Sequence, residues 1–262
     1  MKKTINRIIP AMLVLVALTS LSFMGKDGVI LRLKPQQGKT YTIVTKANMM
    51  TMMEVQGQSM NMTQNMETRQ TLTANEVSDN QVVIETQIEA IKMSVSQMGM
   101  KMEYDSEHPE KTSPMLAGQT DELSKAIKKM ETVKYDAMGN LTDTLDPGMS
   151  QLGAVITQLP EKEVSVGSTW SFDKKQVVSG TEIHAKYTYT VTAISKKSVD
   201  VSIVGAIESK DIEGSYEGTA SLDPKTGMVT KSNIKNNISM TVSEQGMSIP
   251  MTIIGNTTVE MK

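Results

Sequence analysis

Methionine pairs are the residues of this sequence best suited to chemistry. Side chains two positions apart lie on the same face of a strand, so Met60 and Met62, or Met98, Met100 and Met102, could present their thioethers together. Thioethers are soft ligands that favour Cu(I). However, no histidine or cysteine stands beside these pairs, and methionine more often fills irregular apolar space. A Cu(I)-handling protein is therefore an alternative hypothesis, behind one in which methionine serves apolar packing or binding.

The two histidines offer little support for catalysis. His108 stands in the loop sequence Glu107-His108-Pro109-Glu110, and His184 begins an expected strand. The sequence contains no nucleophile elbow, no glycine-rich phosphate loop and no zinc-binding His-Glu-x-x-His pattern. We therefore expect no catalytic residue and no enzyme, and a hydrolase without a recognisable motif is the second alternative.

The spacing of the carboxylates and the absence of cysteine exclude further classes of site. Asp143 with Asp146, and Asp211 with Glu213, lack the ligand number and spacing that Ca²⁺ requires. The chain has no cysteine, which rules out disulfides, a thiolate nucleophile, an iron–sulfur cluster and a cysteine zinc site. The sequence accordingly predicts no metal site and no cofactor.

The N-terminus predicts export. Basic residues at 1–7 precede an apolar run from Ile8 to Met24 that Pro10 and several polar residues interrupt, which is typical of a secretory signal with cleavage between Ser22 and Phe23. The run is short for a membrane span and no cysteine follows it for acylation, so the mature chain is expected in the periplasm or medium without stable membrane insertion. The net charge of −2 becomes more negative once the leader is removed, which argues against nucleic acid as a partner.

Most of the chain predicts antiparallel strands. Val199, Val201 and Ile203 alternate with polar residues, and a polar turn at 195–198 separates them from a similar run that ends at Ala193. Comparable runs cover residues 41–55, 60–74, 82–95, 216–222, 229–242 and 249–261. The hairpin tips are expected at Gly57, Gly99 and Gly246, where a positive φ favours glycine.

Two short helices are expected to interrupt the strands. The first covers residues 121–130, with Thr120 as its cap and apolar residues at helical spacing. The second covers residues 148–159, with Asp146 as its cap, and it ends before Pro160. Each apolar stripe needs a sheet face to cover it.

The chain also repeats itself. Gly38-Lys39-Thr40-Tyr41 recurs as Gly167-Ser168-Thr169-Trp170, which predicts two equivalent strands with Tyr41 and Trp170 as core anchors. Leu72-Thr73-Ala74 matches Val191-Thr192-Ala193, and the turn around Asp136 and Gly139 resembles the turn around Asp223 and Gly227. In both turns the aspartate is expected to bond to the turn backbone. These matches predict a duplication with insertions between the copies.

At the junction of the copies the sequence resembles a family of uncharacterised exported bacterial proteins with methionine-rich hairpins. The likeness rests on a Leu-Pro segment that leads into Val-x-Val-Gly-x-Thr-Trp, here running from Leu159-Pro160 to Val164-Ser165-Val166-Gly167-Ser168-Thr169-Trp170. The resemblance covers most of the mature chain and supports the fold. It implies no activity that could be transferred.

The sequence therefore predicts a mainly β protein, with a duplicated, highly curved, half-barrel-like antiparallel sheet and two short helices, similar in plan to periplasmic lipoprotein carriers. We expect a signal peptide at 1–22, a first half at 23–158 and a second half at 159–262. The predicted function is non-enzymatic, either structural or the binding of an apolar small molecule or lipid in a methionine-lined groove, with the oligomeric state left open. The predicted lining residues are Met60, Met62, Met66, Met98, Met100, Met102, Leu123, Ile127, Leu152 and Ile156.

Overall fold

A computed structural model describes residues 28–55, 57–127, 129–143, 155–178, 181–209, 212–244 and 247–262. Its strands are β1 (Thr40–Val55), β2 (Gln58–Val77), β3 (Val82–Gln97), β4 (Met100–Asp105), β5 (Met130–Tyr135), β6 (Thr169–Val178), β7 (Thr181–Ile194), β8 (Val199–Glu208), β9 (Ile212–Leu222), β10 (Val229–Glu244) and β11 (Met247–Met261). Short 3₁₀ helices at Pro109–Lys111 and Pro114–Leu116 lead into the helix α1 (Ala117–Ala126). The predicted mainly β class is confirmed.

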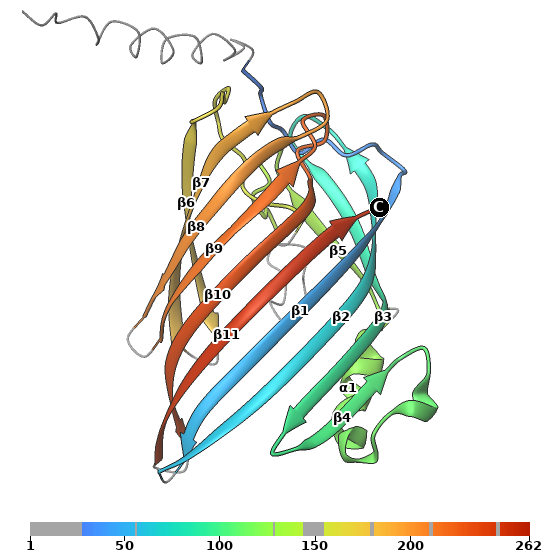
Figure 1. Ribbon diagram of the computed structural model, residues 1–262. Coiled ribbons are helices and arrows are strands. Elements are labelled where there is room, and N and C mark those ends of the chain that lie inside the picture. The colour runs from blue at the N-terminus through green and yellow to red at the C-terminus, as the bar shows by residue number, and fades with distance from the viewer. Residues whose placement is uncertain are drawn as a thin grey trace, which may run out of the picture.

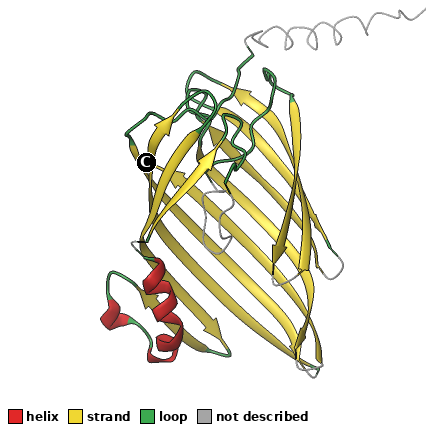
Figure 2. Ribbon diagram, turned by 180° about the vertical axis from the view of Figure 1, so that it is seen from behind, coloured by secondary structure: helices red, strands yellow, loops and turns green. Residues whose placement is uncertain are grey.

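All the strands belong to one antiparallel sheet that curls strongly along its width (Figure 1). The order is β4, β3, β2, β1, β11, β10, β9, β8, β7 and β6. Strand β5 is not on this path: it pairs with residues 82–87 of β3, whereas β4 pairs with residues 92–97 of β3. The first and last strands of the chain therefore pair in the middle of the sheet. The long hairpins β1–β2 and β10–β11 reach one end of the molecule, whereas most of the irregular connections gather at the other end (Figure 2).

The repeat is visible in the hydrogen bonds that start each copy. Gly38 and Gly167 both have positive φ, at 75° and 88°. The N–H of Gly38 donates to the carbonyl of Ala74 at 2.7 Å, and the N–H of Gly167 donates to the carbonyl of Val191 at 2.8 Å. Ala74 thus corresponds to Val191, two residues away from the predicted match of Leu72 with Val191. The shared hydrogen-bond pattern supports the predicted duplication, which stays a prediction.

The two aspartate turns are similar as well, although the second is one residue longer. The backbone N–H of Gly139 donates to the carbonyl of Asp136, and the N–H of Gly227 donates to the carbonyl of Asp223. Each aspartate carboxylate also accepts from turn backbone, as predicted. The first turn follows β5 and the second follows β9, so β1, β2, β3 and β5 correspond to β6, β7, β8 and β9.

An insertion separates β3 from β5 in the first copy, where the second copy joins β8 to β9 by a short connection. The insertion carries β4, the 3₁₀ turns and α1. The division of the chain into halves at residues 158 and 159 stays a prediction, because strands from both halves form one continuous sheet.

The first predicted helix is displaced. It begins at Ala117, after Leu116 rather than Thr120, and it ends at Ala126. Ile127 is already extended and forms a parallel bridge with Ile88, and Met130 starts β5. Pairing with the sheet therefore overrides the helical spacing that the sequence carries beyond residue 126.

The second predicted helix, at 148–159, is wrong over the part that the structure describes. Residues 148–154 lie outside the described residues, and Val155 to Leu159 are not helical. The carbonyl of Val155 accepts the N–H of Val229 at 2.9 Å, and the N–H of Leu159 donates to the carbonyl of Met138 at 2.8 Å. Pro160 also disfavours a helical conformation at the preceding residue.

The glycines predicted at hairpin tips are confirmed where they are described. Gly57 has φ 77° in the β1–β2 turn, and Gly99 has φ 79° in the β3–β4 turn. Gly246 and the predicted signal segment 1–22 lie outside the described residues.

The main core fills the concave side of the sheet at the end where the turns gather. It joins buried side chains of the first copy, such as Tyr41 and Ile43, to Val201 and Leu222 of the second copy. Residues from distant strands of an open sheet can only meet on its concave side. Val155 to Leu159 contributes three further buried apolar residues to this core.

Candidate functional site: the concave face

Strand pairing assigns every side chain to one face of the sheet. Residues directly opposite each other on neighbouring strands lie on the same face, and residues two apart along a strand share a face. Tyr41 and Ile43 are buried in the core, and the pairing of β1 with β2 and β11 continues without a register shift. Met49 and Met53 therefore lie on the same concave face as the core.

A methionine wall continues the concave face of the first copy beyond the core. It comprises Met49 and Met53 of β1, Met60, Met62 and Met66 of β2, Met93 of β3 and Met102 of β4. All seven side chains are only partly buried. A large part of this apolar face therefore stays accessible to solvent or to a ligand.

The structure brings some of the predicted lining residues together and separates others. Leu123 and Ile127 pack with Met93 and Met102 against a second small core beneath α1. Ile156 belongs to the main core instead, because its segment is extended across the end of the sheet. Leu152 lies outside the described residues.

Two predicted lining residues are at the tip of the β3–β4 hairpin. Met98 and Met100 are 76% and 52% exposed. Met98 adopts a positive φ of 51° in the turn, so neither side chain is held within the wall. Met60, Met62, Met66 and Met102 share the concave face as the period-two spacing predicts.

An aromatic wall occupies the concave face of the second copy. It comprises Trp170 and Phe172 of β6, Tyr187 and Tyr189 of β7 and Tyr216 of β9. The ring centroids of Trp170 and Tyr189 are 5.1 Å apart, those of Phe172 and Tyr187 are 5.2 Å apart, and those of Tyr187 and Tyr216 are 5.6 Å apart. The sequence predicts Trp170 as a core anchor and, through period-two spacing, Tyr187 and Tyr189 on one strand face, but it does not predict that these rings meet.

The aromatic wall carries no charge at neutral pH. Burial raises the pKa of Tyr187, Tyr189 and Tyr216 above the ordinary tyrosine value. The hydroxyl of Tyr189 forms a 2.8 Å hydrogen bond with the hydroxyl of Thr157, and the indole N–H of Trp170 donates to the carbonyl of Gln158 at 3.0 Å. The segment before Pro160 thereby fixes the end of the wall that touches the core.

Glycines within the second copy make room for the rings of the aromatic wall and for a neighbouring strand. Gly205 is opposite Tyr187 on one side and Tyr216 on the other. A Cβ atom at Gly205 would lie 2.8 Å from Cδ1 of Tyr187, and one at Gly214 would lie 3.0 Å from the backbone oxygen of Asn237. Glycine at these positions permits close approach of a ring and of a neighbouring strand.

The convex face differs from the concave face because it is polar and charged. Lys46, Glu67, Lys92 and Asp105 are successive cross-strand partners on β1 to β4. Lys46 and Glu67 are 3.3 Å apart, and Lys92 is 3.5 Å from Asp105. Charged and hydroxyl side chains thus face water over much of the convex face, although Met50, Val204 and Ile254 are also exposed there.

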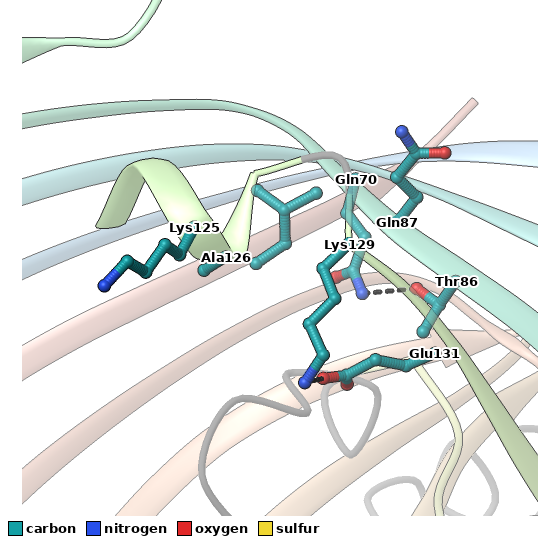
Figure 3. A pocket seen from close by; sticks show the side chains of 8 residues that line it. Gln70, Thr86, Gln87, Lys125, Ala126, Lys129 and Glu131 are labelled. Atoms are coloured by element: carbon teal, nitrogen blue, oxygen red, sulfur yellow. Dashed lines mark hydrogen bonds and ion pairs between the residues drawn. The ribbon is translucent and has the colours of Figure 1, made fainter. Parts of the chain in front are cut away.

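A small cavity of about 200 Å³ lies where α1 meets the sheet (Figure 3). Its polar side chains include Gln70, whose amide donates to the hydroxyl of Thr86, and Lys129, which is 3.3 Å from Glu131. The remaining lining residues are Gln87, Ile88, Lys125 and Ala126. The cavity is small and most of its lining residues carry polar or charged groups, so it is a less suitable site for an apolar ligand than the open concave face.

The residues considered for catalysis and metal binding do not assemble. His108 lies in an exposed loop with its Nδ1 atom 3.4 Å from Glu110, and His184 is exposed on the convex side of β7. Within the described part of the chain, no three histidine, aspartate or glutamate side chains are grouped so that they could hold a metal ion. The described helices also include none long and apolar enough to cross a membrane.

Comparison with solved structures supports the fold. The chain is similar to lipovitellin in a structure concerned with lipid–protein interactions, with a TM-score of 0.51, 11% identity, and coverage of 87% of this chain and 25% of the lipovitellin chain. It is also similar, at a TM-score of 0.38 and 9% identity, to the translocator domain of autotransporter NalP from Neisseria meningitidis, with coverage of 93% and 92%. The second similarity is too low to bear on the fold.

Sequence comparison reaches only part of the chain. No curated protein matches it. The part that matches a family model runs from α1 through the junction of the copies to the start of β10, and so includes the Leu-Pro and Gly-x-Thr-Trp motif. Residues 123–229 match DUF6263, a family of unknown function.

Proposed function

We propose that this protein is an exported, non-enzymatic binding protein that holds an apolar ligand of the lipid class on its concave face. The single observation that carries the proposal is the inversion of polarity across the sheet. The convex face presents ion pairs to water, whereas the concave face continues the core as partly buried methionine and aromatic side chains. An extended accessible apolar surface of this kind marks an interaction site.

Burial of this surface supplies the driving force for binding. Covering apolar surface contributes about 25 cal/mol per Å². Methionine side chains have three rotatable bonds and a polarizable sulfur, so the methionine wall can adjust to acyl chains of different shape. The aromatic wall is a more rigid surface on the other copy. Together they suit a long or irregular apolar ligand better than a compact polar substrate.

The similarity to lipovitellin also supports an apolar ligand. The match covers most of this chain, and the lipovitellin structure concerns lipid–protein interactions. The shared feature is a large curved antiparallel sheet, so the support concerns the fold and not the identity of the ligand.

A fluorescent fatty acid tests the proposal. We expect it to bind the parent protein with micromolar affinity, corresponding to about −8 kcal/mol, and to raise the melting temperature. Met62→Glu places a carboxylate on the concave face. It should weaken binding by at least about tenfold, because a bound ligand would cover the carboxylate and remove its hydrating water.

Met50→Glu is the matched control, because Met50 lies on the convex face of β1 and is already 38% exposed. We expect it to bind the fatty acid as the parent does. Circular dichroism during heating establishes that both variants remain folded. A parent protein that binds no fatty acid, or two variants that weaken binding equally, would contradict the proposal.

A further inference from the structure

Four methionines form one row across four neighbouring strands of the concave face. Met53 of β1 is directly opposite Met60 of β2 on one side and Met251 of β11 on the other. Met251 is in turn opposite Met240 of β10. The order across the sheet is therefore Met240, Met251, Met53 and Met60, although β1 and β2 are separated from β10 and β11 by most of the chain.

The spacing of the row allows several thioethers to meet. Neighbouring strands lie about 4.8 Å apart, and the Cβ atoms of directly opposite residues lie about 4.5–5.5 Å apart. Methionine has three rotatable side-chain bonds. The side chains of three adjacent strands can therefore turn toward one point above the middle strand, with either Met53 or Met251 at the centre.

The surroundings of the row select a soft cation. All four side chains are partly buried, which leaves them accessible while removing some of their contact with water. The next inward positions toward the core are Met62, Thr51, Ile253 and Ile238, none of which is charged. Mg²⁺ and Ca²⁺ require oxygen ligands, whereas thioethers favour Cu(I). A monovalent ion also costs less to desolvate among neutral ligands than a divalent ion does.

We propose that the row formed by Met240, Met251, Met53 and Met60 binds a soft monovalent cation of the Cu(I) or Ag(I) type. This site differs from the pairs along single strands that the sequence suggested. Met98 and Met100 are exposed at a turn, and Met62 lies one inward position away from the row. The cation site goes beyond the proposed apolar ligand and occupies the end of the concave face near the β1–β2 and β10–β11 hairpin tips (Figure 1).

Titration with Ag(I), which is stable in air, tests the site in the complete protein. We expect one Ag(I) per chain to bind tightly enough to compete with a thioether chelator of low affinity. The double variant Met53→Leu and Met251→Leu removes the two central sulfurs but keeps apolar side chains of similar volume. It should weaken Ag(I) binding by at least about tenfold, because leucine offers no soft ligand.

The matched control is Met50→Leu with Met52→Leu, which removes two sulfurs of the same strand from the convex face. It should bind Ag(I) as the parent does. Fatty-acid binding is measured separately on both double variants, so that loss of the cation and loss of the apolar ligand are recorded independently.

Methyl NMR of the parent protein provides a second measurement that needs no variant. Ag(I) should shift the methyl signals of the four row methionines more than those of Met50 and Met52. Equal Ag(I) affinity in the two double variants, equal methyl shifts on both faces, or no stoichiometric binding by the parent would overturn the proposal and leave the row as apolar packing.

Discussion

The methionine wall and the aromatic wall use different side chains on strands that are mostly equivalent, because only β4 of the methionine wall lacks a counterpart in the second copy. Both copies begin with a positive-φ glycine that donates to the end of the next strand, and both end in an aspartate–glycine turn. The concave face of one copy carries flexible thioethers, whereas that of the other carries stacked rings. The two copies therefore share a backbone plan but present different apolar surfaces on the concave face.

The largest difference between the two walls should be in the unfolding free energy that is lost when one side chain is truncated to alanine. Met66 and Trp170 lie in one row of cross-strand partners, at opposite sides of the sheet. Trp170→Ala removes the stacking on Tyr189 and the hydrogen bond to Gln158, and we expect it to cost about 3 kcal/mol of unfolding free energy. Met66→Ala should cost about 1–2 kcal/mol, since Met66 is only partly buried.

Urea denaturation of both variants measures this difference. Tyr189→Phe, which keeps the ring, should cost less than Trp170→Ala. Equal losses at Met66 and Trp170 would show that the walls are packed alike and that the distinction between them is one of composition only.

High pH should weaken the aromatic wall selectively. Burial raises the pKa of Tyr187, Tyr189 and Tyr216 in the folded protein, and it raises the pKa of Tyr135 in the first copy to about 12. The folded state therefore holds these protons more tightly than the unfolded state, so the stability is fully present below the unfolded value of about 10 and is lost as the pH rises above it.

We expect the unfolding free energy to fall as the pH rises from 9 to 12, by up to about 3 kcal/mol for Tyr135, whose pKa is raised to about 12. Tyr187→Phe should reduce this fall, whereas Met62→Leu in the methionine wall should leave it unchanged. If the fall in stability stays as large as in the parent after Tyr187 and Tyr216 are both replaced by phenylalanine, the titration does not arise from these two residues of the aromatic wall.

The smallest predicted effects test the equivalence of the two copies. Gly38 and Gly167 have similar positive φ values, and no neighbouring atom lies within 4 Å of a Cβ built on either. Gly38→Ala and Gly167→Ala should each cost about 1–2 kcal/mol through backbone strain alone. Chemical denaturation should give the same loss for both, and clearly unequal losses would mean that the copies no longer share this turn.

Local patterns were sufficient to predict most of the strands and the glycine turns, but they missed β4 and β5, and Met130, the first residue of β5, was predicted to end a helix. Alternation at Val199, Val201 and Ile203 is correct, because one face of that strand is buried. The same alternation correctly places Met60, Met62 and Met66 on one face. The helices were predicted less well, because Ile127 pairs with Ile88 and Val155 bonds to Val229, and neither partner can be inferred from helical spacing.

The sequence by itself determined which residues alternate, where glycine and aspartate close the turns, and that two similar units exist, because these depend on neighbours a few positions apart. Only the tertiary structure decided that β1 pairs with β11, which brings Met53 beside Met251 and continues the concave face from the methionine wall to the aromatic wall. Pairing between distant strands is set by the core that the two copies share, since a register shift of one residue would turn every core side chain of a strand toward water.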